Sequence, residues 1–131
     1  MQTLPDTLCY LNGELLPLRE AKVSVLDRGF IFGDGIYEVV PVYARKLFRF
    51  DEHLARLGRS LVKLRINNPL SREQWLERCR PLVAALADKS GAADQLIYIQ
   101  ITRGVALRDH VMPADIEPTV FMMASPMKPA T

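Results

Sequence analysis

The sequence predicts an α+β domain in which two helices pack on one face of an antiparallel sheet. Three observations indicate this fold class. Segments rich in β-branched and aromatic residues lie towards both ends of the chain, two stretches with helical apolar spacing lie between them, and a hairpin signal stands near the start. A chain of 131 residues suffices for one domain with a sizeable core.

The N-terminal part is expected to begin with a hairpin over residues 8–16, because Asn12-Gly13 is typical of a type I′ turn. A short apolar run at residues 23–26, interpreted as a strand, comes next. Three glycines then fall within residues 29–35, which favours a loop with unusual backbone angles.

Residues 36–43 are rich in β-branched and aromatic side chains and are expected to form a strand. Pro41 lies inside this strand and indicates a sheet edge or a bulge, because proline cannot donate to a β-ladder. A turn over residues 44–46 and a short strand over residues 47–50 should follow.

Two helices are expected in the middle of the chain. Asp51 is a plausible N-cap for the first, which should run to about Leu64. Ser71 forms a predicted capping box with Gln74 at the start of the second, and Pro81 should kink or break it. The apolar stripes comprise Leu54, Leu57, Leu61 and Leu64 in the first helix, and Trp75, Cys79, Leu82, Val83 and Leu86 in the second.

The C-terminal part is expected to return to β-structure. A loop over residues 89–94 leads into a strongly β-prone strand over residues 96–102. Residues 103–118 look irregular, and residues 119–125 form the expected last strand. The proline-containing tail from residue 126 is typical of a linker.

Composition excludes several classes of protein. Hydrophobic residues make up 49% and charged residues 24%, and the formal net charge of +2 is too small to indicate nucleic-acid or membrane partners. No signal peptide or membrane-spanning stretch is visible, so the cytoplasm is the expected location. Cys9 and Cys79 make no disulfide framework and are expected to be reduced and buried.

The glycine-rich segment Gly29–Gly35 is the first candidate for chemistry. It lacks the dinucleotide fingerprint, because a strand and not a helix is expected after it, and it lacks the Gly-Lys-Ser/Thr of a Walker loop. A structural turn is the favoured interpretation. A wall of a ligand site stays open as the alternative, since glycine allows close backbone approach.

Arg108, Asp109 and His110 form a second candidate, in the long loop before the last strand. An arginine fork matches a carboxylate in two parallel hydrogen bonds, a histidine can add a donor, and Tyr37 could complete such a pocket. The alternative is a solvated charged loop. Arg56 on the first helix is similarly open, between an exposed helix face and an anion-binding role.

Other chemistries find no support in the residue pattern. His53 is more typical of a local hydrogen-bonding residue than of a catalytic base. No cluster has the spacing of metal ligands, and no Ser/His/Asp arrangement can be defended. The residues alone therefore support a soluble α+β domain with a basic and aromatic loop system.

Four motifs taken in order carry more information than any one of them. They are Tyr10-Leu-Asn-Gly-Glu14, Asp27-Arg-Gly-Phe-Ile-Phe-Gly-Asp-Gly-Ile-Tyr37-Glu38, Leu47-Phe-Arg-Phe-Asp-Glu-His53-Leu-Ala-Arg56-Leu, and Tyr98-Ile-Gln-Ile-Thr-Arg103-Gly104 leading into Arg108-Asp-His110. Their order and spacing resemble the class IV (fold type IV) pyridoxal-phosphate-dependent aminotransferases over residues 8–125. The Arg108-x-His110 motif is most similar to the D-amino acid transaminases.

The resemblance implies that residues 1–125 are the N-terminal small domain of such an enzyme and that residues 126–131 begin an interdomain linker. Pyridoxal 5′-phosphate (PLP) would sit between this domain and a larger one. Arg56 matches the family's ligand of the cofactor phosphate. Tyr37, Arg108 and His110 match the residues that trap the substrate carboxylate, the last two reaching the partner's active site in a homodimer.

The resemblance also implies that no catalytic residue lies in this chain. The Schiff-base lysine is expected in the larger domain, beyond Thr131. Lys128 is the only lysine after the carboxylate-binding loop, and it stands too close to His110 to match. The 131-residue chain alone, as a truncated aminotransferase, is therefore expected to be inactive.

The expected function is to supply the carboxylate trap and a phosphate ligand to a D-amino acid:2-oxo acid transaminase. Branched-chain aminotransferases and aminodeoxychorismate lyases share the glycine-rich motif and stay open as alternatives. A non-catalytic dimerising module is a third possibility, suggested by the missing lysine.

Overall fold

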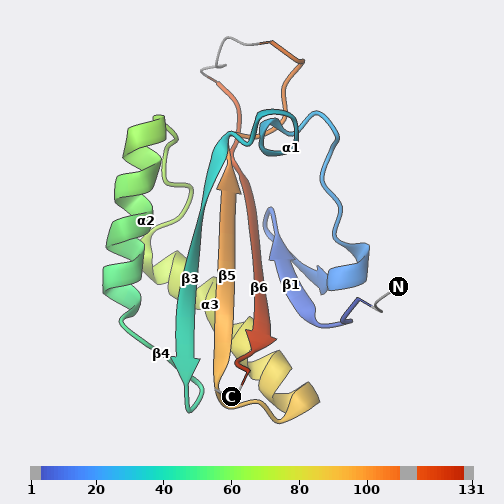
Figure 1. The fold of residues 1–131 in the computed structure, drawn as a ribbon, viewed down its shortest axis with the longest axis vertical. Coiled ribbons are helices and arrows are strands. Elements are labelled where there is room, and N and C mark those ends of the chain that lie inside the picture. Colours follow the sequence, from blue (N-terminus) through green and yellow to red (C-terminus); the bar gives the residue numbers. More distant parts are fainter. Residues whose placement is uncertain (1–3, 110–114, 129–131) are drawn as a thin grey trace.

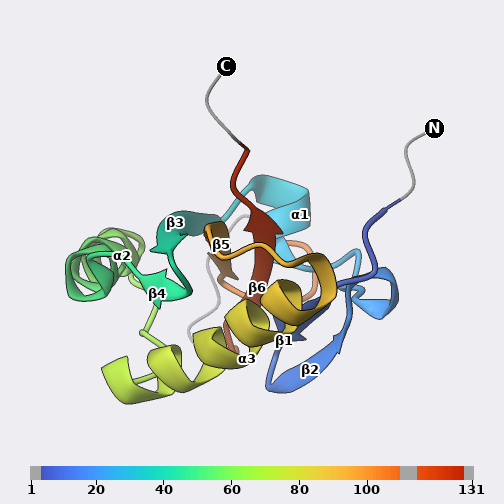
Figure 2. The same cartoon turned by 90° about the horizontal axis from the view of Figure 1, so that it is seen from below.

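The computed structural model describes residues 4–109 and 115–128 and confirms the predicted α+β class. Six antiparallel strands form one sheet in the order β2-β1-β6-β5-β3-β4 (Figure 1). Helix α3 lies against β1, β5 and β6, and α2 lies against β3. Viewed along the strands, α3 runs across one face of the sheet and α2 stands beside β3 and β4 (Figure 2).

The elements have the following bounds. The strands are β1 (Leu8–Leu11), β2 (Glu14–Pro17), β3 (Gly35–Tyr43), β4 (Lys46–Leu47), β5 (Gln95–Thr102) and β6 (Thr119–Pro126), and the helices are η1 (Leu18–Glu20), α1 (Arg28–Phe32), α2 (Phe50–Leu64) and α3 (Arg72–Ser90).

The predicted N-terminal hairpin is confirmed. Asn12 and Gly13 connect β1 to β2 with positive φ angles of 50° and 96°, as a type I′ turn requires. Asn12 also fixes the hairpin to the sheet, because its Oδ1 accepts a hydrogen bond from the Val120 N–H and its own N–H donates to the Val120 carbonyl.

The strand expected over residues 23–26 is wrong. This run joins no strand of the described sheet, and Val23 and Val25 are exposed. The chain forms only an isolated bridge directly after it, between Asp27 and Val105. A short apolar run alone therefore does not predict a strand here, because a strand also needs a neighbouring strand whose backbone groups are free to bond with it.

The glycine-rich segment is a helical turn and not the predicted loop. Asp27 caps α1, since its Oδ1 accepts from the Gly29 N–H at 2.8 Å, and Gly33 ends it in the left-handed conformation with φ 65°. Gly29 has a different reason to be small, because a Cβ there would overlap the Thr102 side chain.

The strand through Pro41 contains no bulge and lies next to the edge of the sheet, where only the short β4 flanks it. The register between β3 and β5 runs unbroken through the pair Pro41 and Leu96. The Pro41 carbonyl accepts from the Phe48 N–H, so the backbone groups of this residue point away from β5 and the missing donor breaks no bond of that ladder. The predicted strand over residues 47–50 shrinks to the two residues of β4.

Helix α2 starts earlier than predicted. Arg49, in the left-handed conformation with φ 51°, occupies the N-cap position, so the prediction of Asp51 as N-cap is wrong. Asp51 instead lies in the first turn, where a negative charge suits the helix dipole. The apolar stripe is confirmed, with Leu57 and Leu61 buried and Leu54 and Leu64 packed against the core.

Helix α3 begins with the predicted capping box. The Ser71 side chain accepts from the Gln74 N–H, and the Gln74 side chain accepts from the Ser71 N–H. The helix continues through Pro81, so a break there is wrong, and it ends only at Gly91 with φ 74°. The expected stripe of five apolar residues is buried, which shows that packing outweighs the loss of one backbone donor.

Alternation along β5 separates a helix-covered face from an open one. Ile97, Ile99 and Ile101 are fully buried beneath the helices, whereas Tyr98 and Gln100 are only half-buried. Both cysteines are free and buried, as predicted. Burial raises the pKa of Cys79 to about 12, so the thiol stays protonated at neutral pH.

Replacing Ser71 with alanine should destabilise the domain by about 1 kcal/mol, because the N-cap acceptor of α3 is lost. Urea unfolding followed by circular dichroism measures this effect. Ser60→Ala on α2 is the matched control, since no cap depends on Ser60, and it should change stability by less than about 0.5 kcal/mol. Equal effects at the two positions would contradict the capping role.

Candidate functional site

A buried carboxylate organises the outer edge of β3. Glu38 points towards α2 and is almost fully buried, with a side-chain exposure of 5%. Arg56 donates to both of its oxygens, from Nε at 2.9 Å and from Nη2 at 2.5 Å. His53 Nδ1 lies 3.0 Å from the same carboxylate. The sequence did not single out Glu38, although it directly follows Tyr37 in the second motif.

Glu38 stays ionised in spite of its burial. Desolvation raises its pKa, but the hydrogen bonds from Arg56 and His53 outweigh this effect and leave the pKa below its usual value. The expectation that His53 serves local hydrogen bonding agrees with this geometry. Because Glu38 engages Nε and Nη2, the Arg56 guanidinium is held in a fixed plane.

Arg56 and Tyr37 line one pocket. The pocket has a volume of about 390 Å³ and is bounded by Tyr37, Glu38, Val39, Arg56 and Ser60. The Arg56 side chain is 60% exposed, and its Nη1 has no hydrogen-bond partner among residues 4–109 and 115–128. An anionic group entering this pocket would therefore meet an oriented guanidinium with unused donors.

Tyr37 belongs to an aromatic row on the open face of the sheet. Its ring stacks on Tyr98 at 6.1 Å between centroids, and Tyr98 in turn contacts Phe121 edge-on at 6.4 Å. The Tyr98 hydroxyl donates to Gln100 Oε1 at 2.8 Å. Tyr37 itself remains largely exposed.

A second buried ion network holds α1 against the sheet. Asp34 accepts from Arg28 Nε at 3.0 Å and from Arg103 Nε at 2.7 Å, and all three side chains are 5–7% exposed. Burial raises the pKa of Asp34, but the hydrogen bonds from Arg103 and Arg28 outweigh it and keep the pKa below its usual value. The sequence did not indicate this network, because Asp34 and Arg103 lie 69 residues apart.

Arg103 connects this network to α2. Its Nη2 donates to the Leu64 carbonyl at 2.6 Å and its Nη1 to the Arg65 carbonyl at 3.3 Å. These are carbonyls at the end of α2, where a cation also suits the helix dipole. The helix that carries Arg56 is therefore fixed at its C-terminus by the same side chain that pairs with Asp34.

Arg108 lies in the loop between β5 and β6, and it does not line the pocket of Tyr37 and Arg56. Its guanidinium lies 5.8 Å from the centre of the Phe32 ring. His110, the third residue predicted to bind a carboxylate, lies outside the described residues. The structure thus brings together Tyr37 and Arg56, and it places Arg108 elsewhere.

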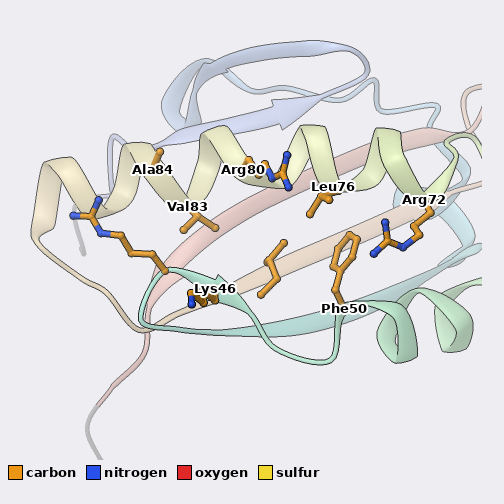
Figure 3. Close-up of a pocket in the computed structure, with 9 residues that line it drawn as sticks. Lys46, Phe50, Arg72, Leu76, Arg80, Val83 and Ala84 are labelled. Carbon is orange, nitrogen blue, oxygen red and sulfur yellow. The ribbon is translucent and has the colours of Figure 1, made fainter.

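The groove between α3 and β4 contains none of the predicted site residues. It has a volume of about 450 Å³, with Leu47, Phe50, Leu76 and Val83 among its apolar walls. The basic residues around it are Arg45, Lys46, Arg72 and Arg80 (Figure 3). Arg72 is paired with Asp51 in the first turn of α2.

Two further features would bear on function, namely clusters of metal-binding side chains and helices able to span a membrane. In the part of the chain that the structure describes, no group of three or more His, Cys, Asp or Glu side chains is placed to hold a metal ion. Within residues 4–109 and 115–128, no helix has both the length and the apolar character that crossing a membrane requires.

Comparison with known families decides what kind of domain this is. The family described as amino-transferase class IV matches residues 35–131. The chain belongs to the class IV aminotransferases. It is 46% identical over 112 residues to the D-alanine aminotransferase of Staphylococcus aureus, a match that covers 85% of this chain and 38% of the relative. The domain thus spans well under half the length of this class IV aminotransferase.

Solved structures of class IV aminotransferases agree with the fold. The branched-chain amino acid aminotransferase of Escherichia coli superposes with a TM-score of 0.81 at 25% identity, over 94% of this chain and 42% of that one. The 4-amino-4-deoxychorismate lyase of Pseudomonas aeruginosa gives 0.71 at 32% identity, over 91% and 40%. The small-domain fold expected from the sequence motifs is therefore confirmed.

Class IV aminotransferases use PLP. Another branched-chain amino acid aminotransferase, solved with pyridoxamine 5′-phosphate, superposes with a TM-score of 0.81 at 23% identity, over 98% of this chain and 43% of that one. The residues present here fit part of such a group, since Arg56 offers an oriented cation with unused donors in an open pocket. A phosphate dianion needs more donors than this one side chain provides.

Proposed function

We propose that this domain anchors the phosphate of PLP and recognises the substrate carboxylate in a transaminase that acts on D-amino acids and 2-oxo acids. The observation that carries the proposal is the shared pocket of Tyr37 and Arg56. When bound, PLP supplies the electron sink for exchange of the amino group. The residues of this domain would bind and orient the cofactor phosphate and the substrate carboxylate.

Arg56 would hold the phosphate through Nη1, which Glu38 does not engage. Glu38 fixes the plane of the guanidinium, and His53 supports the same carboxylate, so the donors are oriented before the anion arrives. No lysine lines this pocket among the described residues. The lysine that attaches the cofactor and the remaining phosphate ligands would come from outside the 131 residues, and the chain alone should not transaminate.

Tyr37, Arg108 and His110 would bind the substrate carboxylate. Because Arg108 does not line the pocket of Tyr37 and Arg56, its contribution to the partner's site in a homodimer is the arrangement we favour. A cytoplasmic homodimer is the expected working form. The D-amino acid preference rests on Arg108 and on the 46% identity to a D-alanine aminotransferase.

Replacing Arg56 with alanine should weaken PLP binding by about 10- to 100-fold, the usual cost of a lost hydrogen bond to a charged group. The test uses the polypeptide in which this domain is joined to the lysine-bearing domain. Arg59→Ala, a neighbouring exposed arginine on α2, is the matched control and should bind PLP normally.

Unphosphorylated pyridoxal sharpens this experiment. Arg56→Ala should leave pyridoxal binding nearly unchanged if the arginine contacts the phosphate. Equal losses for PLP and pyridoxal would show a general structural defect, caused by leaving Glu38 buried without its partner. That result would overturn the phosphate role.

Replacing Arg108 with alanine should lower kcat/KM for D-alanine by about 10- to 100-fold through a higher KM, because a charge-assisted contact to the carboxylate is removed. Arg45→Ala, at an exposed turn, is the control. A parallel assay with L-leucine and aminodeoxychorismate separates the alternatives. Preference of the unsubstituted enzyme for either of these, or an unchanged profile in Arg108→Ala, would contradict the D-amino acid assignment.

A further inference from the structure

The Phe32 ring lies beside two arginines. The guanidinium of Arg28 is 4.7 Å from the ring centre, and that of Arg108 is 5.8 Å from it. Both distances fall within the range of cation–π attraction. Arg28 also binds the loop that carries Arg108, since its Nη1 donates to the Asp109 carbonyl at 2.8 Å. Side chains of α1 therefore contact the loop at two successive residues.

The support under this contact is rigid. Arg28 is buried and paired with Asp34, and its backbone N–H donates to the Gly104 carbonyl at 2.8 Å. Gly33 ends α1 with a backbone bond back to Gly29 at 3.1 Å. Phe32, as the last residue of α1, thus projects from a short helix that is tied to the sheet on several sides.

Arg108 itself is exposed, and an exposed arginine samples many rotamers. A ring face that attracts the guanidinium restricts this sampling without neutralising its charge, so the donors stay available to a carboxylate. Less conformational freedom is then lost when the anion binds.

We propose that Phe32 is a positioning residue for Arg108, and that its ring orients the guanidinium towards the substrate carboxylate before binding. This inference rests on the proposed function, because it takes Arg108 as a carboxylate ligand. It assigns to α1 a part in substrate affinity, in addition to its structural role in the Asp34 network.

The first test measures the contact in the 131-residue chain. The Phe32 ring should shift the Arg108 side-chain Hδ protons upfield in NMR spectra, and an Arg108→Lys spectrum identifies these signals. Phe32→Leu should abolish the shift, whereas Phe32→Tyr, which keeps the ring, should preserve it. Phe30→Leu is the matched control, because Phe30 is an exposed residue of the same helix.

The second test measures catalysis in the polypeptide that includes the lysine-bearing domain. Phe32→Leu should raise KM for D-alanine and for the 2-oxo acid by about 2- to 5-fold, the factor expected from an exposed cation–π contact, with kcat changed less than twofold. Phe32→Tyr should restore the normal KM. If Phe32 instead touched the substrate side chain, KM would change selectively between D-alanine and bulkier D-amino acids.

Three outcomes would overturn the inference. If the Arg108 Hδ shift is unchanged in Phe32→Leu, the two side chains are not in contact. If KM is unchanged in an otherwise normal enzyme, the contact does not affect substrate affinity. If KM changes for some D-amino acids and not for others, Phe32 touches the substrate directly and does not act through Arg108. Failure of the proposed function looks different, since the unsubstituted enzyme would then not use D-amino acids and Arg108→Ala would have no effect. That result would overturn both proposals together.

Discussion

Replacing Asp34 with asparagine should destabilise the domain by about 3–5 kcal/mol, measured as a lower midpoint of urea unfolding. Asparagine keeps the size of the side chain but removes the charge, which leaves the buried guanidinium groups of Arg28 and Arg103 without a counter-ion. A folded domain usually has about 5–15 kcal/mol of stability, so much of the folded state would be lost.

Asp51→Asn provides the matched control for this prediction. Asp51 also pairs with an arginine, Arg72, but both side chains are at least half exposed. Water screens such a pair, so the loss should stay below about 1 kcal/mol. Equal effects of Asp34→Asn and Asp51→Asn would contradict the view that burial makes the Asp34 network important.

The pH dependence gives a second check on Asp34. Its pKa is lower in the folded state than the ordinary value of 3.8, so ionised Asp34 adds stability above that value. This contribution is lost as the pH falls through the folded-state pKa. The stability gap between the natural chain and Asp34→Asn should therefore be full at pH 7 and shrink below about pH 4.

Replacing Gly104 with alanine should cost about 3 kcal/mol or more. Its φ of 116° is strained for any residue with a side chain, and a Cβ would overlap the Glu117 carbonyl oxygen. The backbone cannot easily move away, because the Gly104 N–H donates to Thr102 and its carbonyl accepts from Arg28. Chemical unfolding of the variant measures the loss.

Gly58→Ala is the opposite control. Gly58 lies inside α2, and a Cβ there would meet no atom within 4 Å. Alanine favours the helix over glycine, so this change should stabilise the domain by about 0.5–1 kcal/mol. If the two glycine substitutions shifted stability in the same direction, the structural account of Gly104 would be wrong.

Local signals in the sequence predicted the elements well where the deciding interaction lies within a few residues. Asn12-Gly13 made its turn, and Ser71 and Gln74 made their capping box. The errors arose where a distant partner decides. Residues 23–26 pair with no strand of the described sheet. Helix α3 continues through Pro81 because its packed apolar face outweighs the tendency of proline to break a helix.

The candidate site also has a part that the sequence indicated and a part that depends on distant partners. The motifs pointed to Tyr37, Arg56 and Arg108 as binding residues, and the structure places the first two around one pocket. It also supplies what the motifs did not indicate, namely that Glu38 orients Arg56 and that Phe32 lies against Arg108.

The sequence by itself determined the α+β class, the boundaries of most helices and strands, and the membership of the class IV aminotransferases. These depend on periodicity, caps and motif order, all of which can be followed along the chain without knowing which distant residues touch. Only the tertiary structure decided which charges meet. Asp34 reaches Arg103 because β3 and β5 pair in one register, and Glu38 reaches Arg56 because α2 packs beside β3. Such pairings follow from the folded arrangement of the strands and helices, so spacing along the chain could not show them.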